Sequence, residues 1–308
     1  MNNLLRAGIR RYTHNIVFWL SIVFTIVVSV ISAKNTREFY FDDFYCILIF
    51  FAFAVLISWI VGRENDEGIF RNKVVSGHTK GQIYISELIL GVGACLILFL
   101  LFATVFIAFN WYVFTKASLS VLIRIFLDSM LVNICFAIIL VTLSCIITKR
   151  YIVAIVNIIL VLALIFAAYT VQSIVEQDEY FIAYEYEDKV VTDEFGTHIQ
   201  QEEIEGSEYK VKNSKYIDGF ARDVCEVLYN ILPYGHMTEY TYITNDWFGY
   251  DYYSNFPEMD VTWETSEKDL TVTKEVSNDI TENLIWSIIV SGIICVVGYV
   301  IVRKKDIK

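Results

Sequence analysis

Long runs of apolar residues dominate the pattern of hydrophobic and polar positions along this chain of 308 residues. Each run has about 20 residues with few or no charges, which is the length that a helix needs to cross about 30 Å of hydrocarbon. Five of the six are too apolar on all sides for the core of a soluble protein. They predict six membrane-spanning helices, at Ile16–Ala33, Phe44–Gly62, Leu88–Thr115, Ser129–Thr148, Tyr151–Val175 and Asn283–Val302.

Basic residues gather on one side of these predicted helices. Since Lys and Arg are retained in the cytoplasm and short outer loops are depleted of them, this bias sets the orientation. It predicts that both termini and the loop Glu64–Glu87 face the cytoplasm of a cell that carries the chain in its plasma membrane. Thirteen of the 24 basic residues lie on this side: Arg6, Arg10, Arg11, Arg63, Arg71, Lys73, Lys80, Lys149, Arg150, Arg303, Lys304, Lys305 and Lys308.

One long polar insertion separates the fifth and sixth apolar runs. Residues 173–282 hold 26 Asp and Glu against 7 Lys and Arg, a net charge of −19, whereas the whole chain has −11. The sequence therefore predicts an all-α polytopic membrane protein of six transmembrane helices, with an acidic extracellular α+β domain inserted between helices five and six. The expected parts are a cytoplasmic interfacial helix (1–14), transmembrane helices one to five (15–175), the extracellular domain (176–281), and helix six with a basic tail (282–308).

The insertion contains local signals for strands and for one helix. Alternating residues from Tyr180 to Val191, followed by a Glu-Phe-Gly turn, predict strands, and Asp260–Thr265 and Leu270–Val276 predict two more. Apolar residues at helical spacing from Ile217 to Ile231 predict a helix that Pro233 and Gly235 end. Its many aromatic residues form either the core and interfacial belt of this domain or a surface that receives a ligand or rests on the membrane.

The cysteines indicate no disulfide framework. Cys225 is the one cysteine of the insertion, so it is either a free thiol or the partner of Cys46 near an outer helix end.

The charged segment Glu64–Glu87 between the second and third runs predicts a short docking helix. Asn65 is placed to cap its start, Asp66 and Glu67 lie at the positive end of the helix dipole, and Lys73 lies near the negative end. Gly77 supplies a left-handed residue that ends the helix. Glu67 and Arg71 are four residues apart and are predicted to pair across one turn.

The first residues have two open interpretations. Leu5, Ile9 and Tyr12 share one helical face while Arg6 and Arg10 lie toward the other, as in a helix that lies in the membrane interface. The alternative is a basic flank that only sets topology.

The sequence offers no signature of catalysis. It lacks a phosphate-binding loop, a His-Glu-x-x-His helix and a Gly-x-Ser-x-Gly elbow, and its four histidines are scattered. We therefore expect no enzyme activity, cofactor-binding residues or metal site in this chain, and no nucleic-acid partner. Arg124 and Asp128, one turn apart before the fourth run, either line a translocation path or snorkel at the outer interface.

The order of these elements resembles the type-2 family of ATP-binding-cassette exporter permeases. The residues Glu67-Gly68-Ile69-Phe70-Arg71-Asn72-Lys73 are similar to the family's Glu-Gly-Thr-Ile-Arg-Asn-Lys pattern, and Ile83-Tyr84-Ile85-Ser86 is similar to its Ile-Tyr-x-Ser run. Leu232-Pro233-x-Gly235 is a weaker match. The large outer insertion departs from the family.

The resemblance implies a permease subunit of an ATP-driven bacterial exporter. It implies two permease copies or paralogues around one pathway, and a separate cytoplasmic ATPase subunit that holds ATP and magnesium. Membrane lipid is the remaining expected partner. The residues implied for coupling to the ATPase are Glu64, Glu67, Gly68, Arg71, Asn72, Lys73 and Gly77.

The acidic outer domain narrows the expected cargo. Its charge and aromatic residues favour a cationic amphipathic peptide or antibiotic, with a lipid-like molecule as a further candidate, so resistance to antimicrobial peptides is the expected role. The alternative from another functional class is a membrane sensor or immunity protein that binds a ligand on its ectodomain without transporting it.

Overall fold

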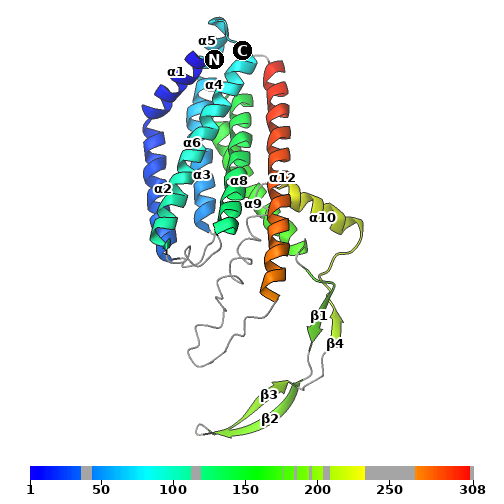
Figure 1. The fold of residues 1–308 in the computed structure, drawn as a ribbon. Coiled ribbons are helices and arrows are strands. Elements are labelled where there is room, and N and C mark those ends of the chain that lie inside the picture. The colour runs from blue at the N-terminus through cyan, green and yellow to red at the C-terminus, as the bar shows by residue number, and fades with distance from the viewer. Residues whose placement is uncertain are drawn as a thin grey trace. The chain divides into compact units, whose positions relative to one another are not determined.

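The structure is a computed structural model of the chain, and it describes residues 1–35, 44–111, 119–175, 177–183, 186–193, 196–203, 209–232 and 268–305. It divides into two compact units, one of Met1–Tyr169 with Asn230–Lys308 and one of Thr170–Tyr229. The first unit is a bundle of long helices (Figure 1). The second unit carries short strands and one helix.

Six helices of the described chain are long and apolar enough to cross a membrane, as the apolar runs predict. They are α2 (Ile16–Asn35), the continuous segment α3 (Phe44–Ile57), η1 (Ser58–Gly62) and α4 (Arg63–Asp66), then α6 (Lys80–Phe109), α8 (Leu119–Ile146), α9 (Arg150–Val175) and α12 (Lys268–Lys304). Two shorter helices of this unit, α1 (Asn2–Thr13) and α5 (Ile69–Val75), lie at the end of the bundle that also holds the last turn of α12 (Figure 1).

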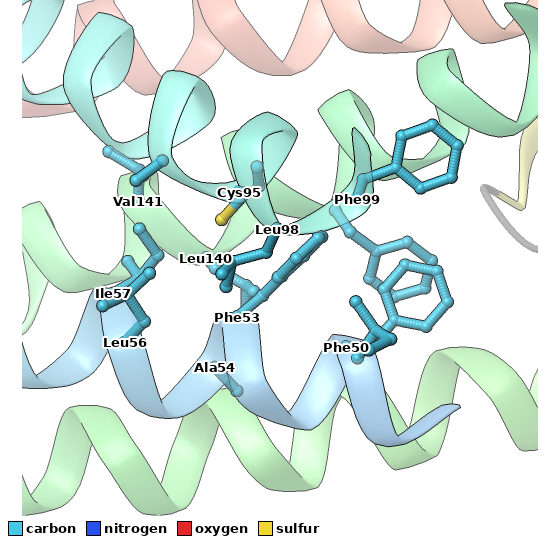
Figure 2. Packing of buried hydrophobic residues seen from close by; sticks show 14 of the residues in the cluster. Phe50, Phe53, Ala54, Leu56, Ile57, Cys95, Leu98, Phe99, Leu140 and Val141 are labelled. Atoms are coloured by element: carbon cyan, nitrogen blue, oxygen red, sulfur yellow. The ribbon is translucent and has the colours of Figure 1, made fainter. Parts of the chain in front are cut away.

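The core of the bundle lies where α3 meets α6 and α8. Figure 2 shows Phe53 of α3 facing Leu98 of α6 and Leu140 of α8, and all three side chains are buried. Phe50 stacks on Phe136 with ring centroids 4.2 Å apart. This aromatic and aliphatic packing is van der Waals contact, which has to hold helices together where lipid is as apolar as the side chains.

Polar side chains inside the bundle also join its helices. Ser29 of α2 donates to the carbonyl of Phe102 of α6 at 2.9 Å. The amide of Asn157 of α9 lies 2.9 Å from Ser58 Oγ in the π-helical turn η1 and 3.2 Å from Ser144 Oγ of α8. Because hydrocarbon offers no alternative partners, such bonds fix how the helices meet.

Several predicted helix ends and one predicted strand differ from the structure. The third transmembrane helix begins at Lys80, because Thr79 and Gln82 form a reciprocal capping box there. The fourth begins at Leu119, which places Arg124 and Asp128 inside α8. The predicted strand Leu270–Val276 is wrong, since these residues belong to α12. Extending a helix that already exists costs much less free energy than starting a new one. This outweighs the preference of a short alternating Thr and Val pattern for a strand.

The second unit holds two separate antiparallel ladders. β1 (Tyr180–Ala183) pairs with β4 (Tyr209–Lys212), and β2 (Tyr186–Asp193) pairs with β3 (Gly196–Glu203). The helix α10 (Phe220–Ile231) follows, and Arg222 ties it to the end of α9 by donating to the carbonyls of Val175 and Gln177 at 3.0 and 3.2 Å.

These elements show no layered packing among the described residues. The apolar side chains of α10, including Phe220 and Val227, are exposed, and Cys225 is a free thiol. The predicted stop at Pro233 and Gly235, the strand Asp260–Thr265 and the aromatic cluster between them lie outside the described residues.

Candidate functional site

Four charged side chains meet at the end of the bundle that holds α5, and each comes from a different helix. We call Arg11 of α1, Glu64 of α4, Lys73 of α5 and Glu87 of α6 the charge cluster. The ammonium of Lys73 donates to Glu64 Oε2 at 2.6 Å and to Glu87 Oε1 at 2.5 Å. Arg11 pairs with Glu64, and its second terminal nitrogen lies 3.6 Å from Glu87 Oε1.

Three members of the charge cluster are shielded from solvent, whereas the side chain of Arg11 is 30% exposed. The side chains of Glu64 and Glu87 are 4% and 0% exposed, and that of Lys73 is 11% exposed. Two cations and two anions give no net charge, which offsets part of the cost of removing them from water. Burial lowers the pKa of Lys73 and Arg11 adds to this effect, while Glu87 opposes both. Phe70, also buried, places its ring 5.2 Å from the same ammonium.

The local chain path explains how Lys73 reaches back to the bundle. The transmembrane helix continues without interruption through α4, so Glu64 still faces the helices beside it. Gly68 then adopts a left-handed backbone with φ of 72°, and α5 begins directly after it. Gly77, with φ of 92°, follows α5 and leads to the capped start of α6. Both glycines occupy conformations that a side chain would strain.

Three predictions about this segment are wrong in detail. Asp66 and Glu67 do not lie at the positive end of the docking helix, because Asp66 ends α4 and Glu67 follows it before Gly68. Asn65 does not cap the docking helix, because it lies within α4; its amide nitrogen instead lies 2.7 to 3.3 Å from the carbonyl oxygens of Ser144, Cys145 and Ile147 and caps the carboxyl end of α8. Glu67 accepts a hydrogen bond from Arg63 at 2.5 Å, not from Arg71. The reason is that Gly68 reverses the chain between Glu67 and Arg71, so one helix turn does not join them.

The structure separates the predicted coupling residues into two groups. Glu64 and Lys73 face inward in the charge cluster. Glu67, Arg71 and Asn72 are exposed, and beside them lies Val75, whose side chain is 80% exposed. α5 therefore has one face bound to the bundle and one face free of it within the described residues. The prediction of Gly77 as a left-handed residue is confirmed.

Sequence reasoning missed two members of the charge cluster. The sequence pattern assigns Arg11 only to the basic flank and places Glu87 at the border of the third apolar run. The signal was available for Glu87, because an ionisable residue at the edge of a membrane span usually faces the protein interior and has a partner. Nothing in the sequence spacing connects Arg11 with residues more than fifty positions away.

Two further lysines, Lys80 at the start of α6 and Lys305 directly after α12, bind backbone carbonyls at the same end of the bundle. Lys80 Nζ donates to the carbonyl of Lys305 at 2.5 Å, and Lys305 Nζ donates to the carbonyl of Cys145 at 3.0 Å. Cations near carbonyl groups at helix carboxyl ends are favoured by the helix dipole. The ends of α8 and α12 and the start of α6 are thus held together next to the charge cluster.

The predicted substrate-path residues lie elsewhere in the bundle. Asp128 is fully buried in α8, so the interpretation of Asp128 as a side chain that snorkels at the outer interface is wrong. The side chain of Arg124 lies outside the described residues. A translocation path along this part of α8 stays a prediction.

The arrangement at the α5 end is suited to mechanical coupling between elements, since buried ion pairs break at high cost when one partner moves away alone.

Among the residues that the structure describes, no group of three or more His, Cys, Asp or Glu side chains is placed to hold a metal ion. No protein-family model, curated protein sequence or solved structure matches this chain.

Proposed function

We propose that this chain is the membrane-spanning permease subunit of an ATP-driven bacterial exporter, with ATP hydrolysed on a separate cytoplasmic subunit. The single observation that carries the proposal is that α5 has one face bound to the bundle and one exposed face. One face is bound to α4 and α6 by the ion pairs of Lys73, and the other presents Arg71, Asn72 and Val75 to the surroundings.

A docking element needs both of these properties. An exposed face provides contacts for a partner, and a rigid attachment transmits the partner's displacement to the membrane-spanning helices. In this chain, α5 directly follows the second transmembrane helix and directly precedes the third, so a force on α5 acts on both. The basic bias on this side supports a cytoplasmic location for α5.

The remaining parts of the proposal follow from the same assignment. Six helices form half of the pathway, so a second permease copy or paralogue completes it. The acidic segment between helices five and six lies outside the cell as an α+β domain and meets a cationic peptide, antibiotic or lipid-like substrate.

The test is reconstitution with any ATP-binding-cassette ATPase that a gene adjacent to the gene of this chain encodes. Full-length chain and ATPase are purified together in lipid nanodiscs, and bound ATPase is quantified with Arg71→Glu, with Glu67→Lys and with the control Lys304→Glu. We expect both loop variants to lose at least tenfold in ATPase affinity, because a contact charge that loses its partner is costly to desolvate, and the control to bind normally. Equal ATPase binding by the loop variants and the control would contradict the role of α5. Failure of the unaltered chain to bind any such ATPase would favour a sensor or immunity protein.

A further inference from the structure

The amino-terminal helix α1 is fixed in its rotation about its own axis. Leu4, Gly8 and Tyr12, spaced four residues apart, form its buried face. Gly8 lies so close to Leu90 of α6 that an added Cβ would collide with it. This face differs from the predicted one, since Ile9 is 56% exposed and Leu5 only partly buried. The opposite face of α1 is therefore presented in one defined direction.

That opposite face is cationic: Asn3, Arg6, Ala7, Arg10, Arg11 and His14, all from α1 and the residue that follows it, border a shallow hollow of about 710 Å³ that is open to the surroundings. Arg6 and Arg10 are exposed, and neither pairs with a carboxylate among the residues that the structure describes. Their neighbours along the chain offer none either, because residues 1–37 contain no Asp or Glu. Two guanidinium groups are thus left without an anion on a helix that is otherwise well packed.

The connection of α1 to the first transmembrane helix sets the level at which the hollow lies in the membrane. Only two residues separate α1, which ends at Thr13, from α2, which begins at Ile16 (Figure 1). Trp19 in the first turn of α2 is half exposed, and its indole nitrogen donates to the carbonyl of Thr13 at 2.8 Å. Tryptophan takes this position at the boundary between headgroups and acyl chains. The carboxyl end of α1 therefore lies at headgroup level.

We propose that α1 is a binding site for an anionic phospholipid, with Arg6 and Arg10 holding the headgroup phosphate in the hollow. A guanidinium offers two parallel N–H donors and a positive charge, and these match two oxygens of a phosphate. A neutral polar group does not offer this combination. The exposed apolar side chains of Ile9 and Ile16 flank the cationic face and provide contacts for acyl chains. This explains why Ile9 points away from the protein core.

The position of Arg11 links this lipid site to the charge cluster. Its side chain lines the hollow and also pairs with Glu64 and Glu87. A headgroup that holds α1 in place stabilises the same packing that brings Arg11 to the cluster. Lipid occupancy therefore strengthens the attachment of α1 to the helices that carry α5. The inference requires insertion of the chain in a membrane but not transport, so it can fail or succeed independently of the exporter function.

The test measures thermal unfolding of the purified full-length chain in mixed micelles with phosphatidylglycerol, with phosphatidylcholine or with inorganic phosphate. The variants are the pair Arg6→Gln with Arg10→Gln, the charge-preserving pair Arg6→Lys with Arg10→Lys, and a control pair, Arg303→Gln with Lys304→Gln, which removes two exposed cations elsewhere. Native mass spectrometry counts the retained lipid.

We expect phosphatidylglycerol to raise the unfolding temperature of the unaltered chain and of the control pair, and phosphatidylcholine to do so much less. The glutamine pair should lose about thirtyfold in apparent affinity for phosphatidylglycerol, with the lysine pair between the two. An equal response of the glutamine pair and the control pair would overturn the proposal. The same stabilisation by phosphatidylcholine would also overturn it, and so would equal stabilisation by inorganic phosphate, which would indicate a simple phosphate site.

Discussion

The ammonium nitrogen of Lys73 lies 2.5 Å from Oε1 of Glu87, and this contact joins the short helix α5 to the start of the third transmembrane helix. Both side chains are largely shielded from water. Since Lys73 also binds Glu64 at the end of the second transmembrane helix, one side chain fastens α5 to both helices that flank it. This makes Lys73 the residue whose removal should have the clearest effect on the attachment of α5.

Lys73→Met should lower the free energy of unfolding by about 3–5 kcal/mol, because two buried carboxylates then share only Arg11. Glu87→Gln should destabilise the chain for the corresponding reason. The double variant leaves Arg11 paired with Glu64 and no net charge, so its destabilisation should be smaller than the sum of the single effects by about 1–3 kcal/mol. Thermal or denaturant unfolding of the purified chain measures all three. Strictly additive effects would show that the two residues do not interact.

Two glycines of α12 should respond differently to alanine. A Cβ at Gly298 would lie 2.7 Å from Cγ2 of Thr142 and would collide with the hydroxyl of Tyr84, whereas a Cβ at Gly292 meets nothing within 4 Å. Tyr84 and Thr142 are themselves hydrogen-bonded at 2.9 Å, so neither moves away freely. Gly298→Ala should cost about 1–3 kcal/mol and Gly292→Ala very little, measured by thermal unfolding. Equal stability of the two variants would refute this packing.

Labelling with an impermeant thiol reagent should show which side of the membrane each end of the bundle faces. In a chain whose six cysteines are replaced, a single cysteine at the exposed position Tyr209 should react in intact cells. Cysteines at Asn72 or Lys304 should react only after the cells are opened, because the basic residues assign that end to the cytoplasm. Reaction of the Asn72 position from outside would reverse the orientation and exclude the proposed ATPase contact.

The long helices could be predicted from the sequence because their cause is local. A run of about 20 apolar residues satisfies both the hydrocarbon around it and its own backbone hydrogen bonds, whatever its neighbours are. The left-handed backbone at Gly77 also has a local cause, because a glycine has no Cβ and adopts a positive φ without strain. The exact helix ends were less so: Leu270–Val276 reads as a strand when taken alone but continues the helix that begins at Lys268.

The sequence by itself thus determined the number of apolar helices, the asymmetry of charge and the place of a short charged element between helices two and three. Only the tertiary structure decided which charges meet. Arg11, Glu64, Lys73 and Glu87 come together because four helices pack at one end of the bundle, and no spacing rule connects them. In the same way Asn65 looks like a helix start, yet it caps the carbonyls of a helix eighty residues away, since a polar side chain near a membrane binds the groups that packing brings to it.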